Sequence, residues 1–147
     1  MKRDKNLIPL SWEHHSGLVF ARRIRKKIEA NESNEHIRNY ILGEWEDSLD
    51  RHFQLEETVI SPVFLKYSPH DSEQAKMEND HNRMREIVRG LYDEKYTVAM
   101  MLEFSELLAR HIRFEEDVLF PLFESKIPAQ EFDAIGIELK SRLSGDA

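Results

Sequence analysis

Histidine and glutamate recur in this sequence at a spacing that suits metal binding. His52 is followed by Glu56, and His111 is followed by Glu115, so both pairs have the form His-x-x-x-Glu. On an α-helix this spacing places the imidazole and the carboxylate one turn apart on the same face, where both can bind one ion. Imidazole and carboxylate suit iron, manganese or zinc, and the donor types alone do not choose among these metals.

The two pairs lie in segments that repeat one another. Residues 52–64 (HFQLEETVISPVF) align with residues 111–123 (HIRFEEDVLFPLF) at a fixed offset of 59 residues. The histidine, both glutamates, a valine, the proline and the final phenylalanine coincide. Pro62 and Pro121 stand at equal distances beyond their motifs, so we expect each helix to kink or end there.

Helical periodicity extends over almost the whole chain, and no alternating strand pattern interrupts it. Four long helices are predicted, over about residues 11–30, 35 to the mid-sixties, 72–94 and 97–125. The expected N-caps of the first two helices are Ser11 and either Ser33 or Asn34.

After Pro128 an amphipathic tail predicts a further helix, with apolar positions at Phe132, Ile135, Leu139 and Leu143. Short connections between long helices are typical of antiparallel neighbours. The sequence therefore predicts an all-α, up-down-up-down four-helix bundle (about 11–126) with a short C-terminal extra helix (128–147). We expect residues 1–147 to form one domain.

Ionisable side chains interrupt the apolar stripes of these helices at positions that should pack in the core. Leucine, methionine and valine flank them on the same faces, and the interrupting residues are His52, Glu56, His81, His111 and Glu115. Burying an unpaired carboxylate costs several kcal/mol, out of a total stability of about 5–15 kcal/mol. Two buried glutamates in one core therefore need a cation.

The first helix offers two neighbouring histidines. His14 lies near the mean direction of that helix's apolar stripe, whereas His15 points away from it. His15 remains an alternative, because Leu18 follows it at the spacing at which Met84 follows His81. With a helix rise of about 1.5 Å per residue, candidates from all four helices come to roughly the same height. The predicted metal ligands are His14, His52, Glu56, His81, His111 and Glu115.

The acids that follow the two candidate glutamates point in another direction. Glu57 and Glu116 are rotated by about 100° from Glu56 and Glu115, so we expect them at the surface.

The order and spacing of these residues resemble those of the hemerythrin-like family, the HHE cation-binding domains. The resemblance covers about Ser11 to Ser125. It implies a four-helix bundle around a non-haem di-iron centre, with oxo or hydroxo and carboxylate bridges. By this resemblance Glu56 and Glu115 are the bridges, and the terminal ligands are His14, His52, His81 and His111.

The chain also departs from the oxygen-carrying members. Those have a third-helix His-x-x-x-His pair, whereas Met77 and Arg85 flank His81 here, and their fourth-helix carboxylate is an aspartate five residues after the histidine. A set of four histidines and two glutamates is more similar to bacterial di-iron proteins linked to nitrosative stress and iron-centre repair. Those often carry a cysteine-bearing N-terminal segment, and this chain has no cysteine.

We therefore expect a metal-binding protein with two iron ions that binds or senses O2, NO or iron state; manganese or zinc would suit the same ligands. One alternative is a di-iron enzyme acting on peroxide or NO. Another is a metal-free helical interaction domain. No separate substrate pocket or acid/base set is visible in the sequence, which favours binding over catalysis. A ferritin-like oxidase is disfavoured, because its Glu-x-x-His motif occurs only once, at Glu78 and His81.

Composition narrows the function classes further. Twenty-eight acidic and 21 basic residues give a net charge of −7 with no basic stripe, which argues against a nucleic-acid partner. The absence of cysteine excludes disulfides and thiolate metal sites. No apolar run approaches the roughly 18 residues of a membrane span, and no secretory signal is visible. We expect a cytoplasmic protein that does not bind membranes.

Overall fold

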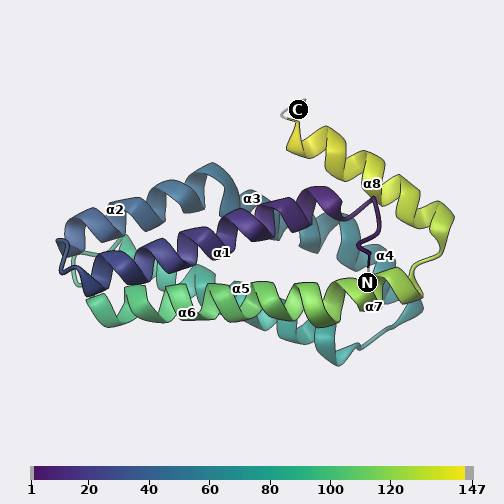
Figure 1. Ribbon diagram of the computed structural model, residues 1–147. Helices are drawn as coiled ribbons and strands as arrows, with labels where there is room; N and C mark the ends of the chain where they lie inside the picture. The colour runs from purple at the N-terminus through teal and green to yellow at the C-terminus, as the bar shows by residue number, and fades with distance from the viewer. Residues whose placement is uncertain (1, 145–147) are drawn as a thin grey trace.

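The computed structural model describes residues 2–144, and all regular structure within them is helical. Figure 1 shows long helical segments lying side by side, with a further helix, α8, at one end. The all-helical prediction is confirmed.

Four long helices account for most of these residues. The first is α1 (Ile8–Glu29) and the third is α5 (Ser72–Leu91). The second runs through α2 (Asn34–Glu44), η1 (Trp45–Leu49), α3 (Asp50–Leu55), η2 (Glu56–Ile60) and α4 (Ser61–Tyr67). The fourth runs through α6 (Val98–Phe114), η3 (Glu115–Leu119) and α7 (Phe120–Lys126). The elements η1, η2 and η3 are π-helical turns.

Three of the four long helices start at a side-chain cap, and the first long helix does not. Ser33 accepts a hydrogen bond from the His36 N–H, and Asp71 accepts from the N–H groups of Glu73 and Gln74. The prediction that Ser11 caps the first helix is wrong. That helix begins one turn earlier because Pro9 in its first turn has a helical φ built in.

The helices continue through the two repeated prolines. Directly before Pro62 the Ser61 N–H donates to the Glu56 carbonyl, and before Pro121 the Phe120 N–H donates to the Glu115 carbonyl. These bonds span five residues, so each wider π-helical turn takes up the disruption that a proline causes. The expected break is thus a local widening of the helix, and each wide turn begins at a repeated glutamate.

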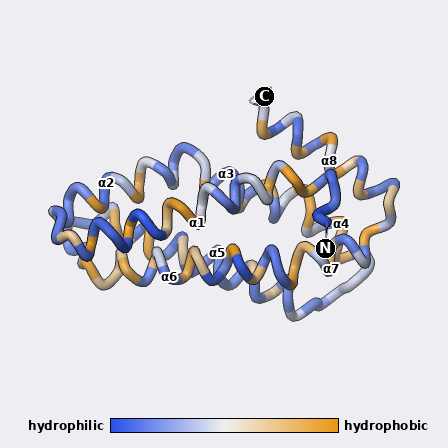
Figure 2. Tube along the Cα trace, in the orientation of Figure 1, coloured by the Kyte–Doolittle hydropathy of each residue, from blue (hydrophilic) through white to orange (hydrophobic). Residues whose placement is uncertain are grey.

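Buried apolar side chains form two clusters, one toward each end of the molecule. One contains Phe20, Ile41, Met84, Phe104 and Ile112; the other contains Leu10, Phe64, Met77, Phe123 and Ile135. Figure 2 shows hydrophilic and hydrophobic residues alternating along the long helices. On each long helix the predicted ligands fall where residues of one cluster give way to those of the other, so a polar layer divides the core.

The predicted C-terminal helix is present as α8 (Ala129–Leu143). It buries Phe132, Ile135 and Leu139 against the second apolar cluster, and Lys66 of α4 pairs with Glu131 at 2.7 Å. Residues 145–147 of the expected tail lie outside the described residues. Among the helices of the described chain, none combines the length and hydropathy that crossing a membrane requires.

Candidate metal centre

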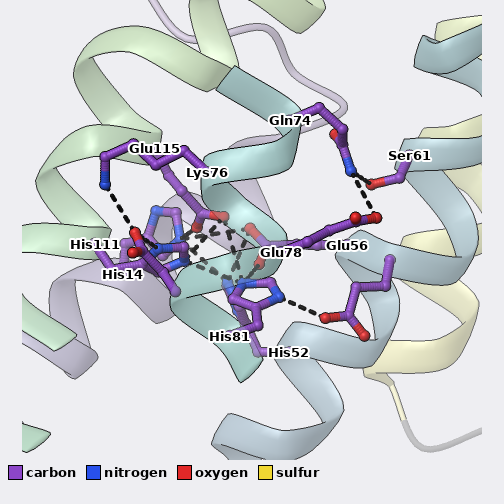
Figure 3. Close-up of polar contacts among 12 residues, drawn as sticks. His14, His52, Glu56, Ser61, Gln74, Lys76, Glu78, His81, His111 and Glu115 are labelled. Carbon is purple, nitrogen blue, oxygen red and sulfur yellow. Dashed lines mark hydrogen bonds and ion pairs between the residues drawn. The ribbon is translucent and has the colours of Figure 1, made fainter. Parts of the chain in front are cut away.

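The six side chains that the sequence singles out converge in the polar layer between the two apolar clusters (Figure 3). None exposes more than 4% of its surface. They come from six elements: His14 from α1, His52 from α3, Glu56 from η2, His81 from α5, His111 from α6 and Glu115 from η3. His15 is exposed, so the structure distinguishes the two histidines of the first helix.

The donor atoms form two overlapping groups. His14 and His52 lie with both glutamates in one group, and His81 and His111 lie with the same two glutamates in the other. Within each group the donor atoms are all within 4.8 Å of one another. Glu56 and Glu115 therefore stand between two positions that could each hold a cation.

The inward Nε2 atoms of the rings approach these carboxylates closely. His14 Nε2 lies 2.7 Å from Glu115 Oε1, and His52 Nε2 lies 3.4 Å from Glu56 Oε2. In the second group His81 Nε2 lies 3.2 Å from Glu56 Oε1, and His111 Nε2 lies 3.2 Å from Glu115 Oε2. The two Nε2 atoms of each group are 3.1 Å apart.

The outward Nδ1 atom of every ring faces a carboxylate on another long helix. The distances are 2.6 Å for His14 to Glu116, 2.8 Å for His52 to Glu13, 2.7 Å for His81 to Glu57 and 3.0 Å for His111 to Asp80. An ionised carboxylate only accepts hydrogen bonds, so each Nδ1 donates its proton outward. In a neutral ring this leaves a lone pair on the inward Nε2, which is the tautomer that binds metals.

This donor set fits a pair of cations. Two Nε2 lone pairs that face each other at 3.1 Å cannot bond to one another. In the described chain, none of the four carboxylate oxygens of Glu56 and Glu115 accepts a hydrogen bond of good geometry, although all four are buried. Buried polar atoms without partners are costly, and a cation between them removes that cost.

Without metal, protons must take the place of the cations. Burial raises the pKa of Glu56 to about 8, and the neighbouring charge of Glu115 adds to this shift. Burial alone would lower the pKa of His111, but Glu115 and Asp80 outweigh it and raise that pKa to about 10. Burial would raise the pKa of Glu115, yet His111 and His14 hold it well below its ordinary value.

The identities of the outward carboxylates could not be predicted, and Glu57 and Glu116, expected at the surface, are only partly exposed and face the rings instead. Their side chains are only 23% and 29% exposed. A rotation of 100° from the ligand turns each of them toward the neighbouring helix rather than toward solvent. The sequence does carry a signal for this arrangement, since an acid precedes both His14 and His81 and a second glutamate follows both Glu56 and Glu115.

Each outward carboxylate is also paired with a basic side chain. Arg51 lies 2.9 Å from Glu13, Arg85 binds Glu57 through two contacts of 2.8 Å, Lys76 lies 2.9 Å from Asp80 and Arg3 lies 3.5 Å from Glu116. Burial alone would raise the pKa of Glu57, but hydrogen bonds from His81 and Arg85 lower it to about 2. The outward carboxylates are therefore held ionised as acceptors for the rings.

A family model for the hemerythrin HHE cation-binding domain matches residues 13–123. This chain belongs to that family. The match covers all six converging side chains and both copies of the internal repeat. Comparisons with curated proteins and with solved structures find no match.

Beside the ligand cluster this HHE domain has a cavity of about 190 Å³. His14, His52, His111 and Glu115 form its inner end, and Gly17 of α1 with apolar residues of α6 and the second long helix forms its walls. No separate pocket was visible in the sequence, because the residues that line it are scattered over helices that become neighbours only on folding. Small molecules therefore have a space next to the candidate metal ligands.

Proposed function

We propose that this HHE domain is a non-haem di-iron protein that binds or senses O2, NO or iron state, built on an up-down-up-down four-helix bundle. His14 and His52 would hold one iron, His81 and His111 the other, and Glu56 and Glu115 would bridge them. The observation that carries the proposal is that two buried donor groups share both glutamates. Family membership favours iron over manganese and zinc, which suit the same donors.

When bound, the iron pair supplies open coordination positions and a change of oxidation state. Each group offers four protein donors, which is fewer than an octahedral ion takes. Two divalent ions also carry more positive charge than two glutamates neutralise, so a hydroxo or oxo bridge suits the remaining charge. The four outward carboxylates hold the rings in their metal-binding orientation. Phe53 also stacks on His81, with the two ring centroids 4.0 Å apart.

Elemental analysis of protein purified without added metal tests this proposal directly. We expect two irons per chain, and optical spectra that differ between aerobic, anaerobic and NO-treated samples. A metal-free protein would overturn the proposal and favour a helical interaction domain. Two zinc ions per chain with no redox response would support a metal site but overturn the proposed binding of O2 or NO to iron.

A di-iron enzyme acting on peroxide or NO is the second candidate. The cavity beside His14, His52 and His111 favours it, because a reactant could reach the metal ligands there. Iron-loaded protein supplied with an electron donor should then consume peroxide or NO over many turnovers. Consumption of no more than one equivalent per iron pair would support binding or sensing instead.

A further inference from the structure

The cavity beside the ligand cluster is larger than a diatomic molecule needs. Its volume is about 190 Å³. An engineered protein cavity of about 150 Å³ lined by leucine, isoleucine and phenylalanine binds benzene. The space is therefore sufficient for an organic molecule of one ring.

The walls of the cavity suit an apolar body. They are formed by Leu49, Phe53, Leu108 and Ile112, with Gly17 of α1 opposite Ile112. A Cβ atom at position 17 would lie 2.7 Å from Ile112 Cδ1, so Ile112 packs directly on the glycine and a side chain there would displace it from the wall. Burial of one ring against such walls is favourable, since apolar surface leaves water.

The outer end of the cavity carries an acidic group without a basic partner. Ser16 and Glu44 line both this cavity and a surface depression between α1 and α2, so they mark the end that opens to solvent. Ser48 donates a hydrogen bond to Glu44 Oε2 at 2.9 Å. In the part of the chain that the structure describes, no basic side chain pairs with Glu44, whereas Glu13 nearby is taken up by His52 and Arg51.

We propose that this cavity binds a small primary amine with an apolar body of about one ring. The ring lies between the apolar walls, and the ammonium group lies at the mouth beside Glu44. This site goes beyond the proposed iron chemistry and does not depend on which metal is bound. The metal ligands form the inner end of the cavity, so the organic ligand would lie beside the candidate metal centre.

Calorimetric titration of the purified full chain, with its metal content measured first, tests the charge at the mouth. The probes are benzylamine and benzyl alcohol, which match in shape and differ in charge. We expect benzylamine to bind about fivefold more tightly than benzyl alcohol, the equivalent of one partly exposed ion pair. Glu44→Gln should remove this difference and leave the affinity for benzyl alcohol unchanged. A preference for the amine that persists in Glu44→Gln would overturn the proposed orientation.

Substitutions in the wall and at the mouth test the location. Ser48→Phe, at a partly exposed position, should abolish the binding of both probes. Gly17→Ala should weaken both by about fourfold, the equivalent of one methyl group. Gly43→Ala is the matched control, because its Cβ meets nothing within 4 Å. Binding that Ser48→Phe and Gly17→Ala both leave intact would overturn the proposal.

The metal measurement separates this proposal from the di-iron proposal. Amine binding by a chain without two irons would overturn only the di-iron proposal. Two irons per chain with no binding of either probe would overturn only the amine site.

Discussion

Every histidine of the cluster is fixed at both ring nitrogens. The inward Nε2 faces the shared glutamates, and the outward Nδ1 donates to a carboxylate that is itself paired with arginine or lysine. Such outer partners orient the ring, fix its tautomer and raise its basicity as a metal ligand. The centre thus consists of ten side chains, of which six face the candidate metal positions.

Replacing different glutamates of the fourth long helix by alanine should weaken metal binding to different extents. Glu115→Ala should lower the iron content below two per chain, because both donor groups lose an oxygen ligand. Glu116→Ala should weaken metal affinity by about 10–100-fold, since His14 loses its acceptor. Glu106→Ala, an exposed acid on the same long helix, should have no effect. Metal competition with a chelator measures all three, and equal affinities for Glu115→Ala and Glu106→Ala would contradict the assignment.

The two histidines of the first helix provide a matched pair. His14→Ala removes a buried ring from one donor group, so one of the two irons should be lost or weakly held. His15→Ala alters an exposed ring and should leave the iron content at two per chain. Elemental analysis of both variants decides between them, and loss of iron from His15→Ala alone would reverse the assignment.

Single residues of the site could be predicted from the sequence where their type conflicts with that of their neighbours. His52, Glu56 and His111 stand out because they interrupt apolar stripes. Glu13 and Asp80 do not stand out, since an acid beside a stripe is ordinary on a solvated helix. Only the packing of neighbouring helices shows that these acids face a ring.

The π-helical turns show how elements position the two carboxylates that both donor groups share. Glu56 and Glu115 each begin a wide turn whose last hydrogen bond ends just before a proline. Because the same turn recurs in both copies of the repeat, the two carboxylates enter the core from equivalent places. Such turns are frequent at functional sites.

Capping of the third long helix should affect stability without affecting the centre. Asp71→Ala removes the acceptor for the N–H groups of Glu73 and Gln74, so the free energy of unfolding should fall by about 1 kcal/mol. Urea denaturation measures this, with exposed Asp47→Ala as the control. The iron content should not change, and a loss of iron would show that the cap also supports the site.

Element positions were largely predictable, whereas their local irregularities were not. The amphipathic spacing of the third helix predicts residues 72–94, and α5 spans Ser72–Leu91. The π-helical turns could not be predicted from Pro62 and Pro121, because a proline is compatible with a kink, an end or a widened turn. Which of these occurs depends on the packing on both sides of it.

For the molecule as a whole, the polar layer divides one core into two apolar clusters. Hydrophobic burial stabilises each end, but the middle carries two buried glutamates and four rings. Its contribution to stability therefore depends on what neutralises the carboxylates.

Removal of metal should destabilise the whole protein. A ligand that binds only the folded state adds about 4 kcal/mol to the free energy of unfolding when its free concentration is a thousand times its Kd. Thermal denaturation with and without a chelator should therefore show a lower Tm for the chelated protein. Identical melting of two samples whose iron contents differ would contradict this coupling.

The metal-free protein should lose stability as pH rises. The pKa of Glu56 is raised from an ordinary 4.5 to about 8, so its contribution is complete below about 4.5 and disappears as pH rises through 8. His111, with a pKa of about 10, acts in the same direction. The lowered pKa of Glu115 affects only the acid end. Urea midpoints should fall between pH 6.5 and 8.5, with a smaller fall in metal-free Glu56→Gln.

The four outward hydrogen bonds connect the four long helices in a closed cycle. Glu13 joins the first long helix to the second, Glu57 the second to the third, Asp80 the third to the fourth, and Glu116 the fourth back to the first. Sliding any one helix by a single turn, about 5.4 Å, would break two of these hydrogen bonds at once. Axial slippage of a helix is therefore resisted at the level of the centre, where a shift would do most damage.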